Sequence, residues 1–239
     1  MSGLRELTLD FGYREESFNH AFNVVLRQCI LPSVNLLQYR ALTIHDFRLT
    51  VFPNARSFLF DIRSQRQLLP ILQDISSHPQ LETLQINKHD WSLRDVQEVV
   101  AHVHNIRFLL LRGELDGVRV SELIPAIQQL PRLQKLALTT KQKAVYPPGP
   151  LGDSQMDEII SQKENHPLNE RPAANALRLF QQCRSLRRVY LPPYWYRPFE
   201  YSGKILGVVQ MAPRPPDIHS EIREWPAISE VARRQAWML

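Results

Sequence analysis

The chain has 239 residues, of which 44% are hydrophobic and 22% charged, a composition typical of a soluble globular protein with a sizeable core. Its net charge of +5, from 29 Lys and Arg against 24 Asp and Glu, is dispersed along the sequence. No apolar run approaches a membrane span, and the first residues lack the basic start and apolar core of a signal peptide. We therefore expect a cytoplasmic or nuclear protein that binds no membrane.

A short phrase, apolar-x-x-apolar-x-apolar, returns along the chain. Its copies are Leu4-x-x-Leu7-x-Leu9, Tyr39-x-x-Leu42-x-Ile44, a looser Ala55-x-x-Phe58-x-Phe60, Leu81-x-x-Leu84-x-Ile86, Ile106-x-x-Leu109-x-Leu111, Leu133-x-x-Leu136-x-Leu138 and Leu186-x-x-Val189-x-Leu191. From the third copy on, the steps are 26, 25, 27 and 53 residues, the last close to two steps. The alternation predicts a short strand at each copy, and a period in the twenties is typical of stacked repeats.

Helical patterns lie between these copies. Apolar stripes at helical spacing predict helices over residues 18–29, 68–75, 92–104, 121–130 and 176–183. In the third helix, Ser92 and Asp95 have the spacing of a capping box. Pro70 is expected in the first turn of the second helix, where a missing N–H is tolerated. Cys29 and Cys183 lie on apolar stripes, which indicates buried thiols rather than a disulfide.

A strand–helix unit of this size cannot bury its own apolar face, so stability must come from stacking on neighbouring units. We therefore expect an α/β fold: a solenoid of irregular repeats over residues 1–140, with a curved parallel sheet and helices on its convex side. Residues 141–172, rich in Pro, Gly and polar residues, predict a mobile insertion. Residues 173–192 would form the last helix–strand repeat, and residues 193–239, rich in Pro and aromatic residues, a C-terminal cap with a last helical pattern at 225–237.

Within each strand, the residues between the apolar positions point to the other face of the sheet and should form an exposed ladder. The residues of this ladder are mostly acidic or small and polar in the early copies, and apolar or basic in the later copies. The candidate partner-binding residues are Phe108, Leu110, Arg112, Lys135, Arg188 and Tyr190. Aromatic and Arg side chains contribute much of the binding energy at protein interfaces. The alternative is that these side chains only cover the next strand or meet the segment after Thr140.

A second hypothesis is nucleic-acid binding through residues 184–197. This segment joins basic and aromatic residues: Arg184, Arg187, Arg188, Tyr190, Tyr194, Trp195, Tyr196 and Arg197. Single-strand binders combine basic grooves with aromatic side chains that stack on bases. Here Pro192, Pro193 and Pro198 interleave with the aromatic residues, which favours a rigid segment packed over the end of the repeats.

The sequence gives no support to an enzyme. It contains no Gly-rich phosphate loop and no G-x-S-x-G motif, and its carboxylates are dispersed. His102 and His104, two residues apart, would lie on different sides of a helix and would not share a metal ion. His89, Asp90 and Trp91 form a polar turn to which the sequence assigns no site. We expect no catalytic residue, no cofactor and no metal.

The phrase, with proline-containing turns such as His78-Pro79-Gln80-Leu81 and Leu130-Pro131-Arg132-Leu133, resembles the long leucine-rich repeats. It looks most like the irregular repeats of fungal F-box-type proteins, over residues 3–140 and 173–192. The Asn or Cys of those repeats is matched only loosely, and F-box helices are absent, so adaptor binding is not carried over. The resemblance implies a surface that holds an unidentified protein, as in the substrate-recognition region of an F-box-like ubiquitin-ligase receptor. Ligase components would bind only through a missing N-terminal module, and the alternative is a truncated repeat protein without independent activity.

Overall fold

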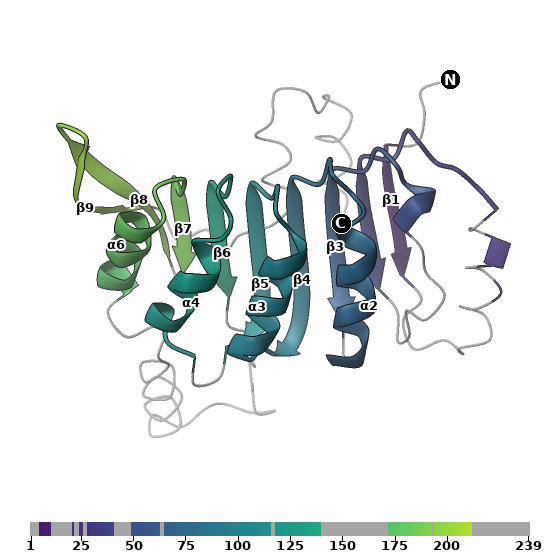
Figure 1. Ribbon diagram of the computed structural model, residues 1–239, viewed down its shortest axis with the longest axis horizontal. Coiled ribbons are helices and arrows are strands. Elements are labelled where there is room, and N and C mark those ends of the chain that lie inside the picture. The colour runs from purple at the N-terminus through teal and green to yellow at the C-terminus, as the bar shows by residue number, and fades with distance from the viewer. Residues whose placement is uncertain are drawn as a thin grey trace, which may run out of the picture.

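The computed structural model describes residues 5–10, 21, 24–25, 28–40, 49–62, 65–115, 118–139, 172–192 and 194–211. Within these ranges the chain forms one open sheet of nine strands, ordered β1 to β9, with four α-helices (Figure 1). The predicted α/β fold is confirmed.

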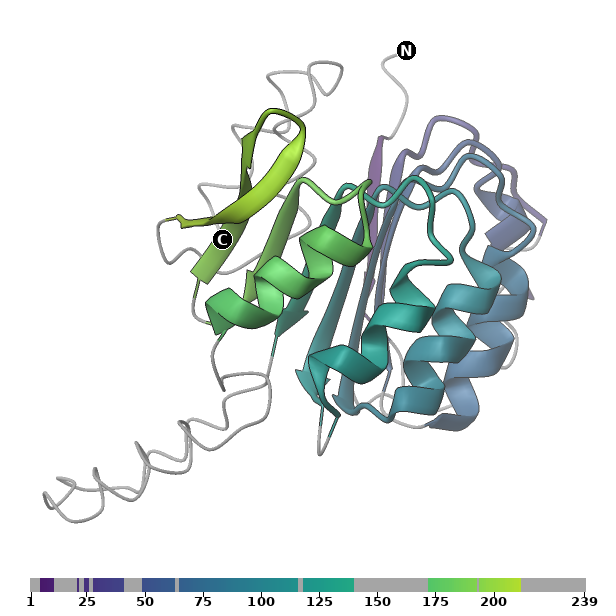
Figure 2. The ribbon, with the colours of Figure 1, turned by 60° about the vertical axis from the view of Figure 1, so that its left-hand side comes forward.

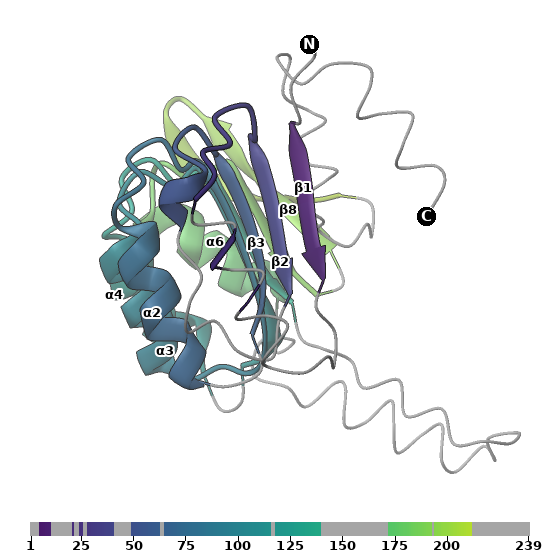
Figure 3. The same ribbon diagram turned by 90° about the vertical axis from the view of Figure 1, so that its right-hand side faces the viewer.

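Seven strands run parallel: β1 (Glu6–Asp10), β2 (Leu36–Arg40), β3 (Ser57–Ile62), β4 (Thr83–Asp90), β5 (Phe108–Glu114), β6 (Lys135–Thr139) and β7 (Arg188–Leu191). They are followed by two antiparallel strands, β8 (Tyr194–Tyr201) and β9 (Lys204–Gln210). The helices are α2 (Gln65–Ile75), α3 (Leu93–His102), α4 (Val120–Ile127) and α6 (Pro172–Gln182), with a 3-10 turn, η1 (Leu49–Val51). These four helices cover one face of the sheet, and each contacts the next (Figure 3).

One backbone hydrogen-bond pattern repeats from strand to strand. The carbonyl oxygen of Glu82, just before β4, accepts from the N–H groups of Arg107 (2.8 Å) and Phe108 (3.0 Å). The carbonyls of Arg5, Asn35, Arg56, Arg107 and Gln134 do the same for the strand that follows each of them. Because this shared-carbonyl pattern recurs from β1 to β7, the strands begin level and equivalent residues form rows across the sheet.

The alternate residues of these rows face the helices and form the main core. One row is Leu7, Leu37, Phe58, Leu84, Leu109, Leu136 and Val189. The apolar stripes of α2, α3, α4 and α6 are buried in the same cluster, as the sequence predicts. Each buried side chain of this size stabilises the fold by about 1.5–3 kcal/mol. The stripe predicted over residues 18–29 lies mostly outside the described residues.

The second copy of the phrase is five residues earlier than predicted. In β2, Leu37 pairs with Leu7 on one side and Phe58 on the other, so the copy is Val34-x-x-Leu37-x-Tyr39. The prediction that it begins at Tyr39 is wrong, because two overlapping apolar patterns fit the sequence and only strand pairing selects one. The outward residues predicted for that copy, at 41, 43 and 45, lie outside the described residues.

Two local predictions also differ from the structure. Pro70 is the sixth residue of α2, not in its first turn, because the helix begins at Gln65, three residues before the apolar stripe. Pro70 is exposed, so its ring lies away from the packed face. Cys29 is exposed, whereas Cys183 is buried, and burial raises the pKa of the Cys183 thiol to about 11.

The predicted segments map onto the described residues as follows. Residues 140–171, most of the predicted insertion, lie outside the described part. The helix α6 begins at Pro172, one residue before the range predicted for the last repeat, and β7 lies within that range. The strands β8 and β9 fall in the range predicted for the cap. The helical pattern at 225–237 also lies outside. Among the helices that the structure describes, none is long and apolar enough to cross a membrane.

A buried ion pair connects the end of β4 to the start of α3. The Nζ of Lys88 lies 2.7 Å from Oδ2 of Asp95, and both side chains are buried. Asp95 also accepts hydrogen bonds from the backbone N–H and the hydroxyl of Ser92, each at 2.9 Å, which confirms the predicted capping box. Burial alone would raise the pKa of Asp95, but the hydrogen bonds from Lys88 and Ser92 hold it below its usual value.

Replacing Asp95 should strongly destabilise the fold. We expect Asp95→Ala to lower the free energy of unfolding by about 3–5 kcal/mol, since Lys88 is left buried without its counter-charge. The control is Glu98→Ala on the same helix, which breaks only an exposed ion pair with Arg94 and should cost less than about 1 kcal/mol. Urea unfolding followed by circular dichroism measures both, and equal losses would contradict the assigned role.

Candidate functional site

The sheet brings together the six residues predicted to bind a partner. Phe108, Lys135 and Arg188 are paired across β5, β6 and β7, and Leu110 and Tyr190 lie in the next row on either side of Ala137. Arg112 follows on β5, opposite Thr139. The prediction that these residues are neighbours on one face is therefore confirmed by the strand register.

The three apolar members of this group are buried. Phe108 is 3% exposed, Leu110 0% and Tyr190 7%. With Ala137 and Trp195 they form a second apolar cluster, on the face opposite the helices, and Met211 packs against it. The rings of Tyr190 and Trp195 meet edge to face, 5.4 Å apart. The prediction that these three side chains are exposed is wrong, and the alternative that they cover neighbouring strands fits the structure.

The antiparallel return of the chain contributes to the burial of Tyr190. β8 pairs with β7 and places Trp195 directly opposite Tyr190. The sequence shows that Tyr190 and Trp195 are near each other but not that they share one face of adjacent strands. Burial raises the pKa of the Tyr190 hydroxyl above its usual value.

The polar members of the group remain closer to solvent. Arg112 is exposed, and Lys135 and Arg188 are half-buried. Elsewhere the predicted exposed ladder is buried at Ser57, Leu59, Thr83 and Gln85. It is exposed at Thr8 and half-buried at Glu6, Asp61 and Asn87. The partner-binding role of Arg112, Lys135 and Arg188 stays a prediction.

The segment predicted to bind nucleic acid contains buried aromatic residues and exposed arginines. Trp195 and Tyr196 are 8% and 1% exposed, so these rings are not free to stack on bases. Arg184, Arg187 and Arg197 are exposed, and Arg187 forms an ion pair with Glu200 at 3.6 Å. The packed arrangement that the prolines favour is the one observed for these two aromatic rings.

The strands β8 and β9 form a hairpin at the end of the sheet, beyond β7 (Figure 2). Ser202 and Gly203 make its turn, both with positive φ (50° and 74°), as a two-residue hairpin turn of type I′ requires. Near β7 the hairpin contacts α6, and Tyr196 joins the main core. The end next to β7 is therefore anchored by packing.

Large apolar side chains are exposed on the rest of this hairpin. Phe199 is 53% exposed, Tyr201 69% and Leu206 58%. Phe199 pairs with Gly207, which has no side chain to cover its ring, and Leu206 is an extra residue at the point where the pairing shifts. We call Phe199, Tyr201 and Leu206 the hairpin patch.

The hairpin patch is not predicted from the sequence, since residues 193–239 are expected to form a cap. A signal is present: two runs rich in aromatic and β-branched residues flank the dipeptide Ser202-Gly203. This pattern predicts a hairpin. It does not show which side chains are left exposed, since that depends on how α6 packs.

Comparisons with known proteins add no relative to this description. No protein-family model matches the chain, and no curated protein matches its sequence.

The burial of Phe108 leads to a direct test. Phe108→Ala should lower the free energy of unfolding by about 3–5 kcal/mol, because it leaves a cavity under the second apolar cluster. Arg112→Ala, on the same strand but exposed, should change it by no more than about 0.5 kcal/mol. Denaturant unfolding compares the two, and a Phe108→Ala protein as stable as Arg112→Ala would show that this side chain is not packed.

Proposed function

We propose that this chain is a non-catalytic protein-interaction module that binds a partner through the hairpin patch. The exposure of Phe199, Tyr201 and Leu206 is the observation that carries this proposal. Burying a side chain of this size stabilises a protein or a complex by about 1.5–3 kcal/mol. Because these three side chains stay largely exposed after folding, a partner that covers them would still gain much of this free energy. Aromatic side chains are enriched among the residues that dominate binding energy.

The scaffold would be a leucine-rich-repeat-like solenoid. Its support is the sequential order of β1 to β7, the helices on one face and the shared-carbonyl pattern that recurs at each step. Stacked repeats of this kind offer extended surfaces to partners rather than enclosed catalytic pockets. The hairpin would add an apolar contact at one end of this stack.

The charges beside the patch indicate the chemistry of the partner. Arg197 and Lys204 are exposed on the hairpin, and the nearby carboxylate of Glu200 is already paired with Arg187. A complementary surface would be apolar at its centre and acidic at its rim, since opposite charges at a rim favour association. The resemblance to F-box-type repeats supports the narrower proposal that this partner is the target of a ubiquitin ligase.

Affinity capture with matched variants tests the interaction. The bait carrying Phe199→Ser and Tyr201→Ser should lose the specific partner that the unchanged chain retains, because polar replacements remove the apolar contact. The control is Leu69→Ser, another exposed apolar residue (46% exposed), on α2 at the other end of the helix layer. It should retain the partner in full.

Two results would contradict the proposal. The hairpin variant, shown by its circular dichroism and unfolding midpoint to be folded, would retain the same proteins as the unchanged chain. Alternatively, the Leu69→Ser control would lose them equally, which would indicate non-specific apolar capture. Ligase subunits among the retained proteins would support the narrower proposal, and RNA retained in a strongly salt-dependent manner would favour nucleic-acid binding instead.

A further inference from the structure

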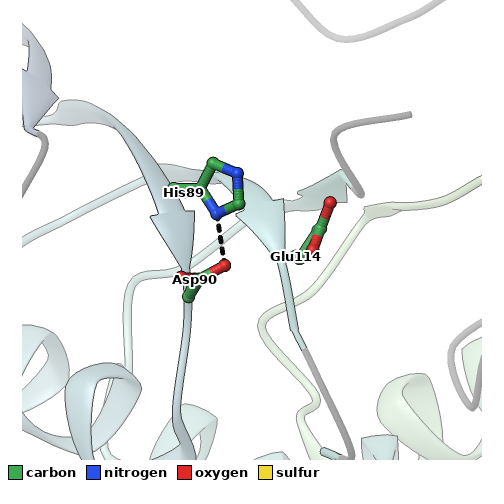
Figure 4. A group of neighbouring side chains, drawn as sticks. All are labelled: His89, Asp90 and Glu114. Carbon is green, nitrogen blue, oxygen red and sulfur yellow. Dashed lines mark hydrogen bonds and ion pairs between the residues drawn. The ribbon is translucent and has the colours of Figure 1, made fainter. Parts of the chain in front are cut away.

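Three side chains with metal-binding atoms meet where β4 and β5 end. His89 and Asp90 are the last two residues of β4, and Glu114 is the last residue of β5 (Figure 4). One ligand atom from each lies within 4.8 Å of the others. We call this group the β4–β5 triad, and it lies away from the hairpin patch at the end of the sheet.

The backbone fixes the triad from both sides. Asp90 pairs with Glu114 after a shift in register that begins at Asn87. The next N–H, that of Trp91, donates to the carbonyl oxygen of Glu114 at 2.7 Å. The Trp91 ring is 2% exposed and donates from Nε1 to the carbonyl oxygen of Arg112 at 3.2 Å, so the turn after the triad is held in the core.

A close approach of the two strands contributes to this arrangement. A Cβ atom on Gly113 would lie 1.7 Å from the carbonyl oxygen of Lys88, and Gly113 has a φ of +147°. Only glycine permits both the short distance and this backbone conformation. The strand ends are thereby brought close enough for side chains from β4 and β5 to reach one ion.

The chemistry of the three donors suits a divalent transition-metal ion. Zn²⁺ binds imidazole nitrogen and carboxylate oxygen at about 2.0–2.2 Å, so ligands of one ion lie roughly 3–4.4 Å apart. The side chains of His89 and Asp90 are 48% and 74% exposed, which leaves them free to rotate over the remaining distance. The hydrogen bond between His89 Nδ1 and the Asp90 carboxylate would be replaced by bonds to the ion. The imidazole distinguishes this group from a chance pair of surface acids, because nitrogen ligands favour zinc over Mg²⁺ or Ca²⁺.

The local charge also favours a cation. Asp90 pairs with Glu114 in the adjacent parallel strand, and two like charges at short range repel each other. The ammonium group of Lys88 donates to the backbone oxygen of Asp90 and forms an ion pair with Asp95. With a neutral imidazole, the triad therefore offers two negative charges to an ion.

We propose that His89, Asp90 and Glu114 bind one zinc ion, with water in the remaining coordination positions. Because the site is shallow and has three protein ligands, its affinity is expected in the micromolar range. The bound ion would cross-link the ends of β4 and β5. This proposal is independent of the proposed protein interaction, since it uses a different surface.

The test is titration of the full chain with zinc chloride by calorimetry, in a Cys29→Ser background so that the exposed thiol cannot bind the metal. We expect one ion per chain and a rise in Tm on zinc addition. His89→Ala and Glu114→Gln should each weaken binding tenfold or more, in line with the roughly 10–100-fold losses seen when groups around a metal are altered. Without metal, Glu114→Gln should be at least as stable as the unchanged chain, because it removes one of two neighbouring carboxylates, and His89→Ala should lose no more than an exposed contact with Asp90.

The matched control is His104→Ala, an exposed histidine two residues after the end of α3 that should leave zinc binding unaltered. Binding that is undiminished in His89→Ala and Glu114→Gln would overturn the site. The absence of one-to-one binding at micromolar to submillimolar zinc would overturn it as well. Magnesium chloride that binds as tightly as zinc would overturn the assignment to a transition metal.

Discussion

The structure depends on one repeated interaction, the carbonyl that accepts two successive N–H groups from the next strand. The carbonyl oxygen of Glu82 accepts hydrogen bonds from the N–H groups of Arg107 and Phe108, and the carbonyls of five other residues repeat the pattern between β1 and β7. It aligns strand starts and so puts chemically equivalent residues in register. A slip of one residue would move every apolar side chain to the opposite face, which makes register the constraint on which the core depends.

The two faces of the sheet are used differently as a result. On one face, rows of Leu, Phe and Ile pack against the helical stripes in a single core. On the other, burial around Leu110 and Tyr190 is completed by Trp195 from the antiparallel strand. The same return of the chain that places Trp195 against Tyr190 extends the sheet into a hairpin. Exposed apolar surface therefore appears at Phe199 and Tyr201 instead of on β5 and β7.

At the junction of β4, β5 and α3, a buried ion pair lies beside exposed side chains that carry donor atoms. The Lys88–Asp95 pair is buried under Trp91, whose ring lies 5.5 Å from the Lys88 ammonium. Their hydrogen bonds cap α3 and fix the turn that follows Asp90. The buried side of the turn is fully engaged in these contacts, while the exposed side presents donor atoms to solvent. The proposed zinc site would therefore rest on a packed turn, with its donor atoms accessible to solvent.

The sequence by itself determined the local structure of this protein. Alternation identified most strands, helical stripes identified α2, α3, α4 and α6, and Ser92 with Asp95 marked a helix start, because these signals depend on residues a few positions apart. Only the tertiary structure decided that the second copy starts at Val34, that Phe108 is buried and that Phe199 is not. The physical reason is that register and burial are set by pairing between distant strands. Alternation shows which residues share a face, but not what covers that face.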